Sequence, residues 1–361
     1  MHLSKLQLVN YKNFENTSFD FDENINCLVG NNGTGKTNVL DAIYHLSQTK
    51  SYFNPVSVQN IKHGKDYFMI EGIFYDGGHE NVYLCSYQKG QKKTVKKNGK
   101  EYTRFADHIG RIPIVIISPY DRDLITERAE IRRKFINHVI SQSDNEYLHA
   151  SMQYAKVLSQ RNALLKYFAK NRTFDPDTLD VYDRQLSDLA DAIYRKRKKF
   201  VQDIAPVLTL LYKSISGDRE EVHIRYRSQL EHAPLYELLK ENIEKDKVLQ
   251  YTGYGIHRDD LEFLMNRDYP IKKFGSQGQQ KSYLIALKLA QFKLLENLSG
   301  TSPILLLDDI FDKLDDERVG RLIQLVNEHA FGQIFISDTH PGRTEQVVQR
   351  SGQSYKIISL A

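Results

Sequence analysis

The chain has 361 residues, of which 40% are hydrophobic and 27% charged, as is usual for a soluble globular protein. This length suffices for two domains, or for one large domain with an inserted lobe. The 50 Lys and Arg residues against 46 Asp and Glu give a net charge of +4, so only local clusters of charge can indicate a nucleic-acid partner.

Membrane insertion and secretion are not indicated by the sequence. No stretch approaches the ~20 consecutive apolar residues of a membrane span, and the N-terminal residues lack the apolar core of a signal peptide. Cys27 and Cys85 lie within apolar stretches without metal-ligand spacing, a pattern typical of buried, reduced thiols. We therefore expect a cytoplasmic protein with no membrane partner.

The first 120 residues are expected to consist mainly of β-strands. Apolar alternation and short apolar runs predict strands near residues 3–8, 19–21, 25–29, 68–75, 81–87 and 112–119. Before the last of these, Asn98-Gly99 is a strong signal for a hairpin with a two-residue turn.

From about residue 122 to residue 216 the pattern changes to helix. Apolar and aromatic residues recur at alternating spacings of three and four along 147–168 and again along 179–215, and Pro176 between them is expected to break a helix. Two such helices joined by a short turn predict an antiparallel helical hairpin. Strand-like residues return at 221–228, and a long apolar helix is expected to begin near Gly278.

Residues 30–37, GNNGTGKT, match the phosphate-binding pattern G-x-x-x-x-G-K-[ST] between an apolar strand and a helical pattern. The glycines allow backbone amides to curl around phosphate oxygens at the positive end of the following helix. Lys36 is expected to contact the β- and γ-phosphates, and the Thr37 hydroxyl to ligate Mg²⁺. The nucleotide-binding residues assigned here are Gly30, Asn31, Asn32, Gly33, Thr34, Gly35, Lys36 and Thr37.

A second half of a nucleotide site is predicted far along the chain, where the apolar residues 304–307 end in two carboxylates. Asp308 is placed to hold Mg²⁺ through water, and Asp309 to orient or deprotonate the attacking water. We therefore assign Asp309 and Lys36 as catalytic, and Thr37 and Asp308 as metal ligands. Buried strands often end in Asp at a turn, so the specificity comes from the pairing with the phosphate loop.

The segment FGSQGQQK predicts a second anion site. Ser276 with Gln279 forms a capping box, so a helix should start here with open amides near Gly278. Because the chain already has one phosphate site, we expect Ser276, Gln277 and Gly278 to contact the γ-phosphate of an ATP bound to a second copy. An ordinary capped core helix is the alternative interpretation.

The residues around this segment carry a family resemblance. SQGQQK, with GIHRDDLEF before it and LLLDDIFDKLD after it, resembles the signature region of ABC-type ATPases and, in its spelling, the RecF family of bacterial recombination mediators. LVNYKNFEN at 8–16, the phosphate loop and SPYDRDLITERAEIRRKFIN at 118–137 are also similar to that family. The resemblance thus covers almost the whole chain.

The resemblance implies an α/β fold, namely an ABC-type P-loop ATPase head, related to SMC and Rad50 heads and built from both chain ends, with an inserted antiparallel helical arm. Residues 1–120 and 251–361 would form the head, and residues 121–250 the arm. Family knowledge further implies ATP and Mg²⁺ as cofactors, an ATP-dependent homodimer, and weak ATP hydrolysis that serves as a switch. The implied partners are double-stranded and gapped DNA with its single-strand/double-strand junctions, RecR together with RecO, and indirectly RecA.

The sequence departs from the family pattern at a few positions. Head-fold relatives usually have Asp-Glu where this chain has Asp308-Asp309, and RecF proteins also tend to have Asp-Asp. The Asp309 side chain is shorter than that of Glu and reaches less far. Ile256 replaces a common proline, and Tyr52 stands where many relatives have an arginine. The polar switch position after the last core strand falls among the three residues Asp338, Thr339 and His340.

Two basic clusters are candidates for DNA contact. Residues 151–214 contain 12 Lys and Arg against 7 Asp and Glu, with RKRKK at 195–199 as the densest part, and the hairpin at 89–104 has 7 basic residues against a single Glu. Such clusters attract phosphates without reading sequence, although each is also typical of a solvated helix face or hairpin tip. We assign DNA contacts to Lys92, Lys93, Lys96, Lys97, Arg195, Lys196 and Arg197.

Three other classes of protein compete with a DNA-binding ATPase. A transport ATPase subunit seldom carries a basic helical arm, and GIHRDDL is not expected there. An SMC-like organiser of DNA needs a much longer coiled coil or a hinge. A nuclease of the overcoming-lysogenization type needs an additional acidic metal-binding domain after the head.

Overall fold

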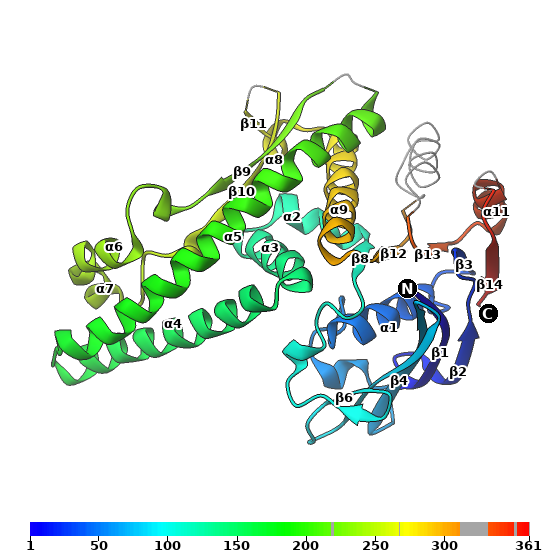
Figure 1. Cartoon of the computed structure of the whole chain (residues 1–361), viewed down its shortest axis with the longest axis horizontal. Coiled ribbons are helices and arrows are strands. Elements are labelled where there is room, and N and C mark those ends of the chain that lie inside the picture. The colour runs from blue at the N-terminus through cyan, green and yellow to red at the C-terminus, as the bar shows by residue number, and fades with distance from the viewer. Residues whose placement is uncertain (218–219, 267, 311–330, 350–351, 361) are drawn as a thin grey trace. The chain divides into compact units, whose positions relative to one another are not determined.

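The structure is a computed structural model that describes residues 1–217, 220–266, 268–310, 331–349 and 352–360 (Figure 1). The chain forms two compact units. Unit 1 comprises residues 1–122, 210–219 and 277–361, and unit 2 comprises residues 123–209 and 220–276. Within the described ranges, no helix combines the length and the apolar character needed to cross a membrane.

Unit 1 contains a parallel sheet assembled from both ends of the chain. Its order is β14-β3-β13-β12-β8, and every neighbouring pair is parallel. The strands are β3 (Ile25–Val29), β8 (Ile114–Ile117), β12 (Ile304–Leu307), β13 (Ile334–Asp338) and β14 (Tyr355–Ser359). All of these strands except β14 are buried along their whole length, as is typical of parallel strands covered on both faces. The predicted strands at 25–29 and 304–307 are confirmed.

A second, antiparallel sheet of unit 1 has the order β2-β1-β4-β5-β6-β7. Its strands are β1 (His2–Tyr11), β2 (Phe14–Asp20), β4 (Tyr67–Asp76), β5 (His79–Gln88), β6 (Thr94–Lys97) and β7 (Lys100–Glu101). Lys97 pairs with Lys100, and the two residues between them, Asn98 and Gly99, have φ values of 49° and 78°. Positive φ at both central positions is the geometry of a type I′ turn, so the predicted hairpin is confirmed.

Helix α1 (Lys36–Gln48) lies between the two sheets, and its burial fixes the phosphate loop in front of it. Leu40 and Ile43 of α1 share one hydrophobic core with Leu6 of β1 and Leu306 of β12. The other helical segments among the described residues of unit 1 are η1 (Ser57–Asn60), η2 (Phe105–Asp107), η3 (Pro119–Arg122), α9 (Gln277–Ser299) and α11 (Pro341–Gln349). The long helix expected near Gly278 is α9.

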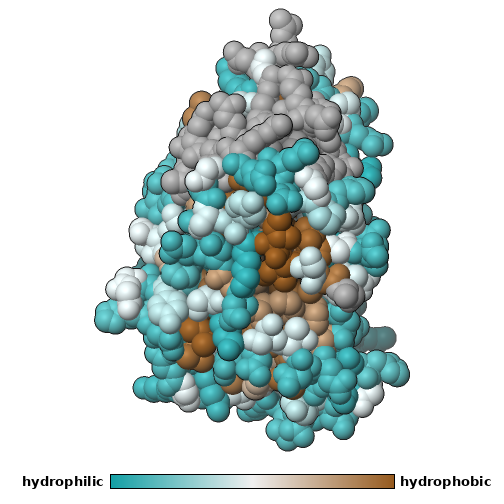
Figure 2. Space-filling model, turned by 90° about the vertical axis from the view of Figure 1, so that its right-hand side faces the viewer, coloured by the Kyte–Doolittle hydropathy of each residue, from teal (hydrophilic) through white to brown (hydrophobic). Residues whose placement is uncertain are grey.

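Apolar side chains lie mostly inside the units. Phe68, Phe74 and Phe335 are fully buried in unit 1. Figure 2 shows a face on which hydrophilic side chains predominate and hydrophobic ones occupy a few areas. This distribution is the one expected of a globular chain in water.

Unit 2 is built on a helical hairpin. Helices α4 (Asn145–Asn171) and α5 (Pro176–Ser216) run side by side (Figure 1). Near the turn that joins them, Leu165 and Phe168 of α4 form a buried apolar cluster with Leu179 of α5. The predicted hairpin is confirmed, and Pro176 is the first residue of α5, where the missing amide is not needed. The last turns of α5 belong to unit 1.

The other described elements of unit 2 are helices shorter than α4 and α5 and a small sheet. The helical ones are α2 (Asp123–Thr126), α3 (Ala129–Ser143), η4 (Gln229–Glu231), α6 (Leu235–Glu241), α7 (Ile243–Leu249), η5 (Ile256–Arg258) and α8 (Ile271–Phe274). The sheet has the order β11-β10-β9, with β9 (Val222–Arg227), β10 (Asp260–Met265) and β11 (Tyr269–Pro270).

The boundary after the arm differs from the sequence-based expectation. Residues 251–276, which we expected in the head, group with the helical unit. The reason is that β10 pairs with β9, and that the GIHRDDL motif bonds to the helices. Asp260 accepts two hydrogen bonds from Arg132 of α3, at 2.7 and 3.0 Å, and Asp259 accepts one from Arg197 of α5 at 2.6 Å.

Candidate nucleotide-binding site

The phosphate loop connects β3 to α1 in a conformation that requires glycine. Gly35 has φ of 106°, and a Cβ there would lie 2.5 Å from the side chain of Asn13. A Cβ on Gly30 would lie 2.4 Å from the carbonyl oxygen of Leu360. Asn13 also donates from Nδ2 to the Thr34 carbonyl at 3.0 Å, which ties the loop to the start of β2. The loop is therefore packed tightly at both ends.

The tip of the loop is exposed to solvent, whereas the lysine side chain of the loop is buried. Asn31, Asn32 and Gly33 are exposed. The Lys36 side chain is buried, and its Nζ donates to the carbonyl oxygens of Gly30 and Asn31 at 2.8 and 2.9 Å. The ammonium thus lies within the curve of the loop, where it adds positive charge to the backbone amides that face an anion.

The two halves of the site meet at Thr37 and Asp308. The Thr37 hydroxyl donates to Asp308 Oδ1 at 2.8 Å, at the edge of the sheet where β3 and β12 end. Ser337 of β13 donates to the same oxygen at 2.9 Å. Burial raises the pKa of Asp308 above its usual value, and the hydrogen bonds from the two hydroxyls oppose that rise. The sequence predicted the first pair but contained no indication of Ser337.

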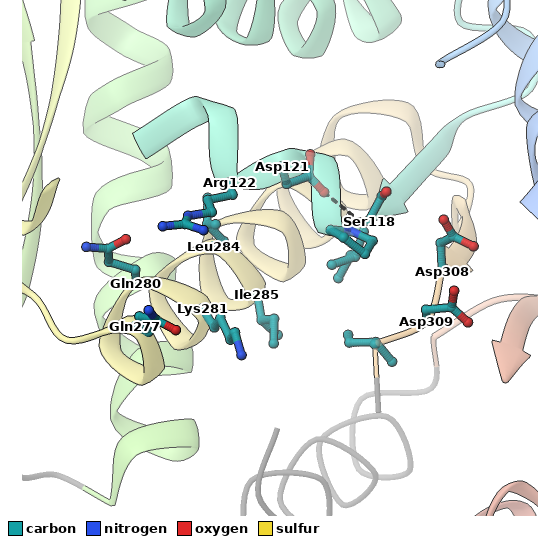
Figure 3. Close-up of a pocket in the computed structure, with 13 residues that line it drawn as sticks. Ser118, Asp121, Arg122, Gln277, Gln280, Lys281, Leu284, Ile285, Asp308 and Asp309 are labelled. Carbon is teal, nitrogen blue, oxygen red and sulfur yellow. Dashed lines mark hydrogen bonds between the residues drawn. The ribbon is translucent and has the colours of Figure 1, made fainter. Parts of the chain in front are cut away.

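Asp309 lies beside a cleft of ≈ 320 Å³ within unit 1. Its backbone has φ of 45°, and its amide donates to Ser337 Oγ at 2.9 Å. Figure 3 shows Asp308 and Asp309 at one end of the cleft and the α9 side chains Gln277 and Lys281 at the other. A half-buried carboxylate at a cleft has the exposure needed to contact a water molecule, and its catalytic role stays a prediction.

The oxygen atoms at this edge suit Mg²⁺. Mg²⁺ prefers oxygen ligands and is usually held by one or two protein groups together with substrate phosphates and water. The Thr37 hydroxyl and the Asp308 carboxylate provide such a pair. Among the described residues, no group of three or more His, Cys, Asp and Glu side chains forms a metal cage. The donor set therefore fits a metal that arrives with a phosphate ligand.

The signature residues precede and open α9. Ser276 and Gln277 are exposed, and Gly278 lies in the first turn of the helix. The start of the helix at Gln277 confirms the expected helix boundary, whereas the contact of these residues with a partner's ATP stays a prediction. The end of the motif LLLDDIFDKLD, after Ile310, lies outside the described residues.

Two buried carboxylates that support the site were missed by the sequence analysis. Asp41 of α1 pairs with Lys12 at 2.5 Å and accepts hydrogen bonds from Tyr11 and Ser51 at 2.8 and 2.6 Å. The backbone amide of Tyr52 donates to its other oxygen at 2.7 Å. The segment that follows α1 is thereby fixed to the helix behind the phosphate loop.

Asp121 forms the second of these centres. It pairs with Lys288 of α9 at 2.7 Å and accepts from the Tyr52 hydroxyl at 2.5 Å and from the Ser118 amide at 2.8 Å. The Tyr52 side chain is thus directed to a carboxylate. A charged Lys288 in the middle of an apolar helix was the signal in the sequence.

The three candidates for a switch residue differ in exposure. Asp338 is buried, and it accepts from the Thr344 hydroxyl at 2.5 Å and from the His340 amide at 3.2 Å. Thr339 is half-buried and His340 is exposed. Asp338 therefore caps the turn after β13, and the identity of the switch residue stays open among the three.

The lysines assigned to DNA on the β-hairpin are not equivalent. Lys92 is exposed, whereas Lys96 and Lys97 are half-buried, with the Lys97 ammonium 5.5 Å from the centroid of the Tyr83 ring. Lys93 donates from Nζ to the carbonyl oxygen of Thr49, and burial lowers its pKa. Lys93 thus has an internal structural contact.

The run at 195–199 is only partly a surface feature. Arg195 is exposed and pairs with Asp191 one turn away, and Lys196 pairs with Asp144 at 2.6 Å. Arg197 is 3% exposed and donates to Asp259, so its assignment to DNA was wrong. The heptad spacing at this position already indicated an inward side chain.

Comparison with known proteins agrees with these features. Residues 2–357 match the family model described as the RecF/RecN/SMC N terminal domain. A Flavobacterium johnsoniae protein named DNA replication and repair protein RecF is 58% identical over 360 residues, which span 100% of both chains. A protein of the same name from Bacteroides thetaiotaomicron is 44% identical over 362 residues, spanning 100% of this chain and 97% of the other.

Solved structures show the same fold. A structure described as the recombination mediator protein RecF-ATP in the RecFOR pathway has a TM-score of 0.86 and 29% identity, and covers 94% of this chain and 92% of that one. An Smc head bound to the C-terminal winged-helix domain of ScpA has a TM-score of 0.59 at 16% identity and covers 99% and 94%. The second likeness concerns the fold alone: an ABC-type ATPase head.

Proposed function

This chain belongs to the RecF family, and on that premise we propose that it is an ATP-dependent, DNA-binding recombination mediator in DNA replication and repair. The observation that carries the proposal is the 2.8 Å hydrogen bond from Thr37 to Asp308, because it joins the phosphate loop to the Asp-tipped strand. A P-loop ATPase needs these two residue types side by side to hold Mg²⁺ against the phosphates.

In this proposal the loop residues 30–37 hold the triphosphate of ATP, and Lys36 neutralises charge on the β- and γ-phosphates. Thr37 and Asp308 hold Mg²⁺, which supplies charge stabilisation for the transferred phosphoryl group when it is bound. Asp309 orients the attacking water. Hydrolysis is slow and DNA-dependent and serves as a switch between two binding states.

ATP joins two copies of the chain head to tail. Each protomer has two anion sites, the phosphate loop and the start of α9, but binds one triphosphate. Both anion sites of each protomer are occupied when Ser276, Gln277 and Gly278 of one copy contact the γ-phosphate held by the loop of the other. A helix of 23 residues preceded by the exposed Ser276 is suited to that contact.

The dimer binds double-stranded and gapped DNA, and together with RecO and RecR it promotes the placing of RecA on gapped DNA. Non-specific contacts come from basic residues at the surface, of which Lys92, Lys96, Lys97, Arg195 and Lys196 remain candidates. They attract phosphates, and their effect depends on salt concentration.

Sedimentation velocity with and without ATP and gapped DNA tests this function. We expect a monomer without nucleotide, a dimer with ATP and Mg²⁺, and a larger complex when gapped DNA is added. Lys36→Ala should remain monomeric in ATP because the phosphate charge is not neutralised. A wild-type chain that neither binds ATP nor sediments with gapped DNA would refute the proposal.

Ser276→Arg tests the arrangement in trans. Its bulk and positive charge should block the dimer while leaving the ATP affinity of the monomer nearly unchanged. In a mixture of Ser276→Arg and Lys36→Ala protein, a heterodimer has one site with both defects and one with neither, so some hydrolysis should return. Loss of ATP affinity in the Ser276→Arg monomer would instead assign the signature to its own chain's nucleotide.

A further inference from the structure

Ser337 is a fully buried serine that connects the two acidic residues of the site. Its hydroxyl donates to Asp308 Oδ1 at 2.9 Å and accepts from the backbone amide of Asp309 at 2.9 Å. A serine hydroxyl has one hydrogen to donate and lone pairs to accept with, so a single side chain serves both residues. Neither bond belongs to the ladder of the sheet.

The register of the sheet explains why β13 provides this group. β12 and β13 pair in parallel with Leu307 opposite Ile336. The residues that follow these two, Asp308 and Ser337, are therefore neighbours. Asp308 itself donates its backbone amide to the carbonyl of Ile117 in β8 at 2.8 Å. Asp308 is therefore held by both neighbouring strands, by β8 through its backbone amide and by β13 through its carboxylate.

The backbone of Asp309 depends on the same hydroxyl. A φ of 45° is uncommon for a residue with a side chain and persists where its surroundings determine it. The Ser337 hydroxyl accepts the Asp309 amide and thus stabilises this turn. The turn determines where the Asp309 carboxylate enters the cleft shown in Figure 3.

We propose that Ser337 is a positioning residue for ATP hydrolysis: it fixes the orientation of the Asp308 carboxylate toward Mg²⁺ and the backbone turn that places Asp309 toward water. The inference rests on the proposed ATPase function of this site. Thr37 and Ser337 both donate to Oδ1 of Asp308, so two hydroxyls fix the orientation of the carboxylate that would hold Mg²⁺. The triphosphate is assigned to the loop at residues 30–37, which follows β3, whereas Ser337 lies in β13.

This division predicts a separation of binding from catalysis. In Ser337→Ala, ATP affinity should stay within about threefold of wild type. The hydrolysis rate at saturating ATP should fall about 10- to 100-fold, since small misplacements of catalytic groups have effects of this size. The Mg²⁺ concentration for half-maximal hydrolysis should rise. Ser337→Thr keeps the hydroxyl and should recover most of the rate.

Ser47→Ala is the matched control. Ser47 is also fully buried in unit 1, and its hydroxyl donates to the carbonyl oxygen of Ile112 at 2.5 Å at the far end of α1. Both variants remove one buried hydroxyl, so both should be less stable, but only Ser337→Ala should change the Mg²⁺ dependence. Where Ser337→Ala is poorly folded, Ser337→Cys retains a similar side-chain shape with a weaker donor and should still slow hydrolysis.

Three results separate the explanations. Wild-type rate and Mg²⁺ dependence in folded Ser337→Ala or Ser337→Cys would overturn the positioning role. A fall in rate proportional to the fall in folded protein, equal in Ser337→Ala and Ser47→Ala, would reduce Ser337 to a structural residue and also overturn it. A wild-type chain without ATP binding would refute the proposed function itself, and this inference with it.

Discussion

Replacing Arg197 with Gln tests whether the basic run at 195–199 is a surface or part of the core. The Arg197 guanidinium is buried in unit 2 and donates to four acceptors. These are Asp259 at 2.6 Å, the carbonyl of Ile256 at 2.8 Å, and Tyr147 and Asn137 at 3.0 Å each. All four acceptors belong to unit 2, so the guanidinium is committed to the protein rather than to a DNA phosphate.

The expected loss of stability in Arg197→Gln follows from Asp259, which would stay buried without its positively charged partner. Burial raises the pKa of Asp259, and the positive charge of Arg197 lowers it. Removing one partner of a buried ion pair costs about 3–5 kcal/mol, against a total stability of about 5–15 kcal/mol for a folded domain. At ~2–4 °C per kcal/mol, the melting temperature of unit 2 should fall by about 10 °C.

The assay is chemical and thermal unfolding, followed by circular dichroism, next to DNA binding at a temperature where all variants are folded. Lys198→Gln, an exposed neighbour, is the control and should change stability by less than ~0.5 kcal/mol. Arg197→Gln combined with Asp259→Asn should recover part of the stability, because the unpaired charge is gone. The reasoning is refuted if Arg197→Gln is as stable as wild type, or if the folded variant binds DNA more weakly than Lys198→Gln does.

Three further outcomes are expected. Lys92→Gln with Lys96→Gln should weaken binding to all duplex sequences alike and lower the log–log salt slope by nearly one unit for each phosphate that is no longer neutralised; an unchanged slope would place the DNA elsewhere. Asp309→Asn should bind ATP normally and prolong the dimer by slowing hydrolysis, and a wild-type rate would remove its role in water activation. His108 donates from Nε2 to the carbonyl of Leu46 at 2.6 Å, and burial lowers its pKa to about 4. In the unfolded chain the His108 imidazole becomes protonated near pH ~6.5, whereas in the folded chain it stays neutral down to about pH 4. The contribution of His108 to the free energy of unfolding is therefore complete above pH ~6.5 and declines as the pH falls toward 4. His108→Gln should reduce the fall in unfolding free energy between pH ~7.5 and ~5 by about 2 kcal/mol, and an identical pH profile would contradict this.

Much of the fold was predictable because its elements carry strong local signals. The Asn98-Gly99 turn and the heptad helices of the arm have patterns that depend on neighbours in sequence. The boundary at residue 250 failed because β10 is a short strand whose partner, β9, lies before two helices. Strand pairing over that distance leaves no local signal.

The site was predictable where a motif fixes the chemistry and less so where it does not. The phosphate loop and Asp308 have a spacing and a context that few other structures share. Ser337 and Asp121 act through partners on other elements, which the folded sheet and its covering helix bring within hydrogen-bond distance. Arg197 was misassigned because charge counts along a helix ignore which side chains turn inward.

The split construction of the head has a consequence for how the chain matures on the ribosome. β3 and β8 are made early, yet their sheet partners β12, β13 and β14 all follow residue 303. At ~5–20 residues per second, the segment between β8 and β12 takes on the order of 10–40 s to synthesise, time enough for unit 2 to fold. During that interval β3 and β8 present unpaired edges, which are prone to aggregation.

The phosphate loop also contacts Leu360, which is synthesised after all of these strands. The Leu360 amide donates to the carbonyl of Val29 at 2.8 Å, and its own carbonyl lies against Gly30. Competence to hold a nucleotide is therefore acquired late in translation, and a nascent chain stalled before β12 carries a folded arm without a working head.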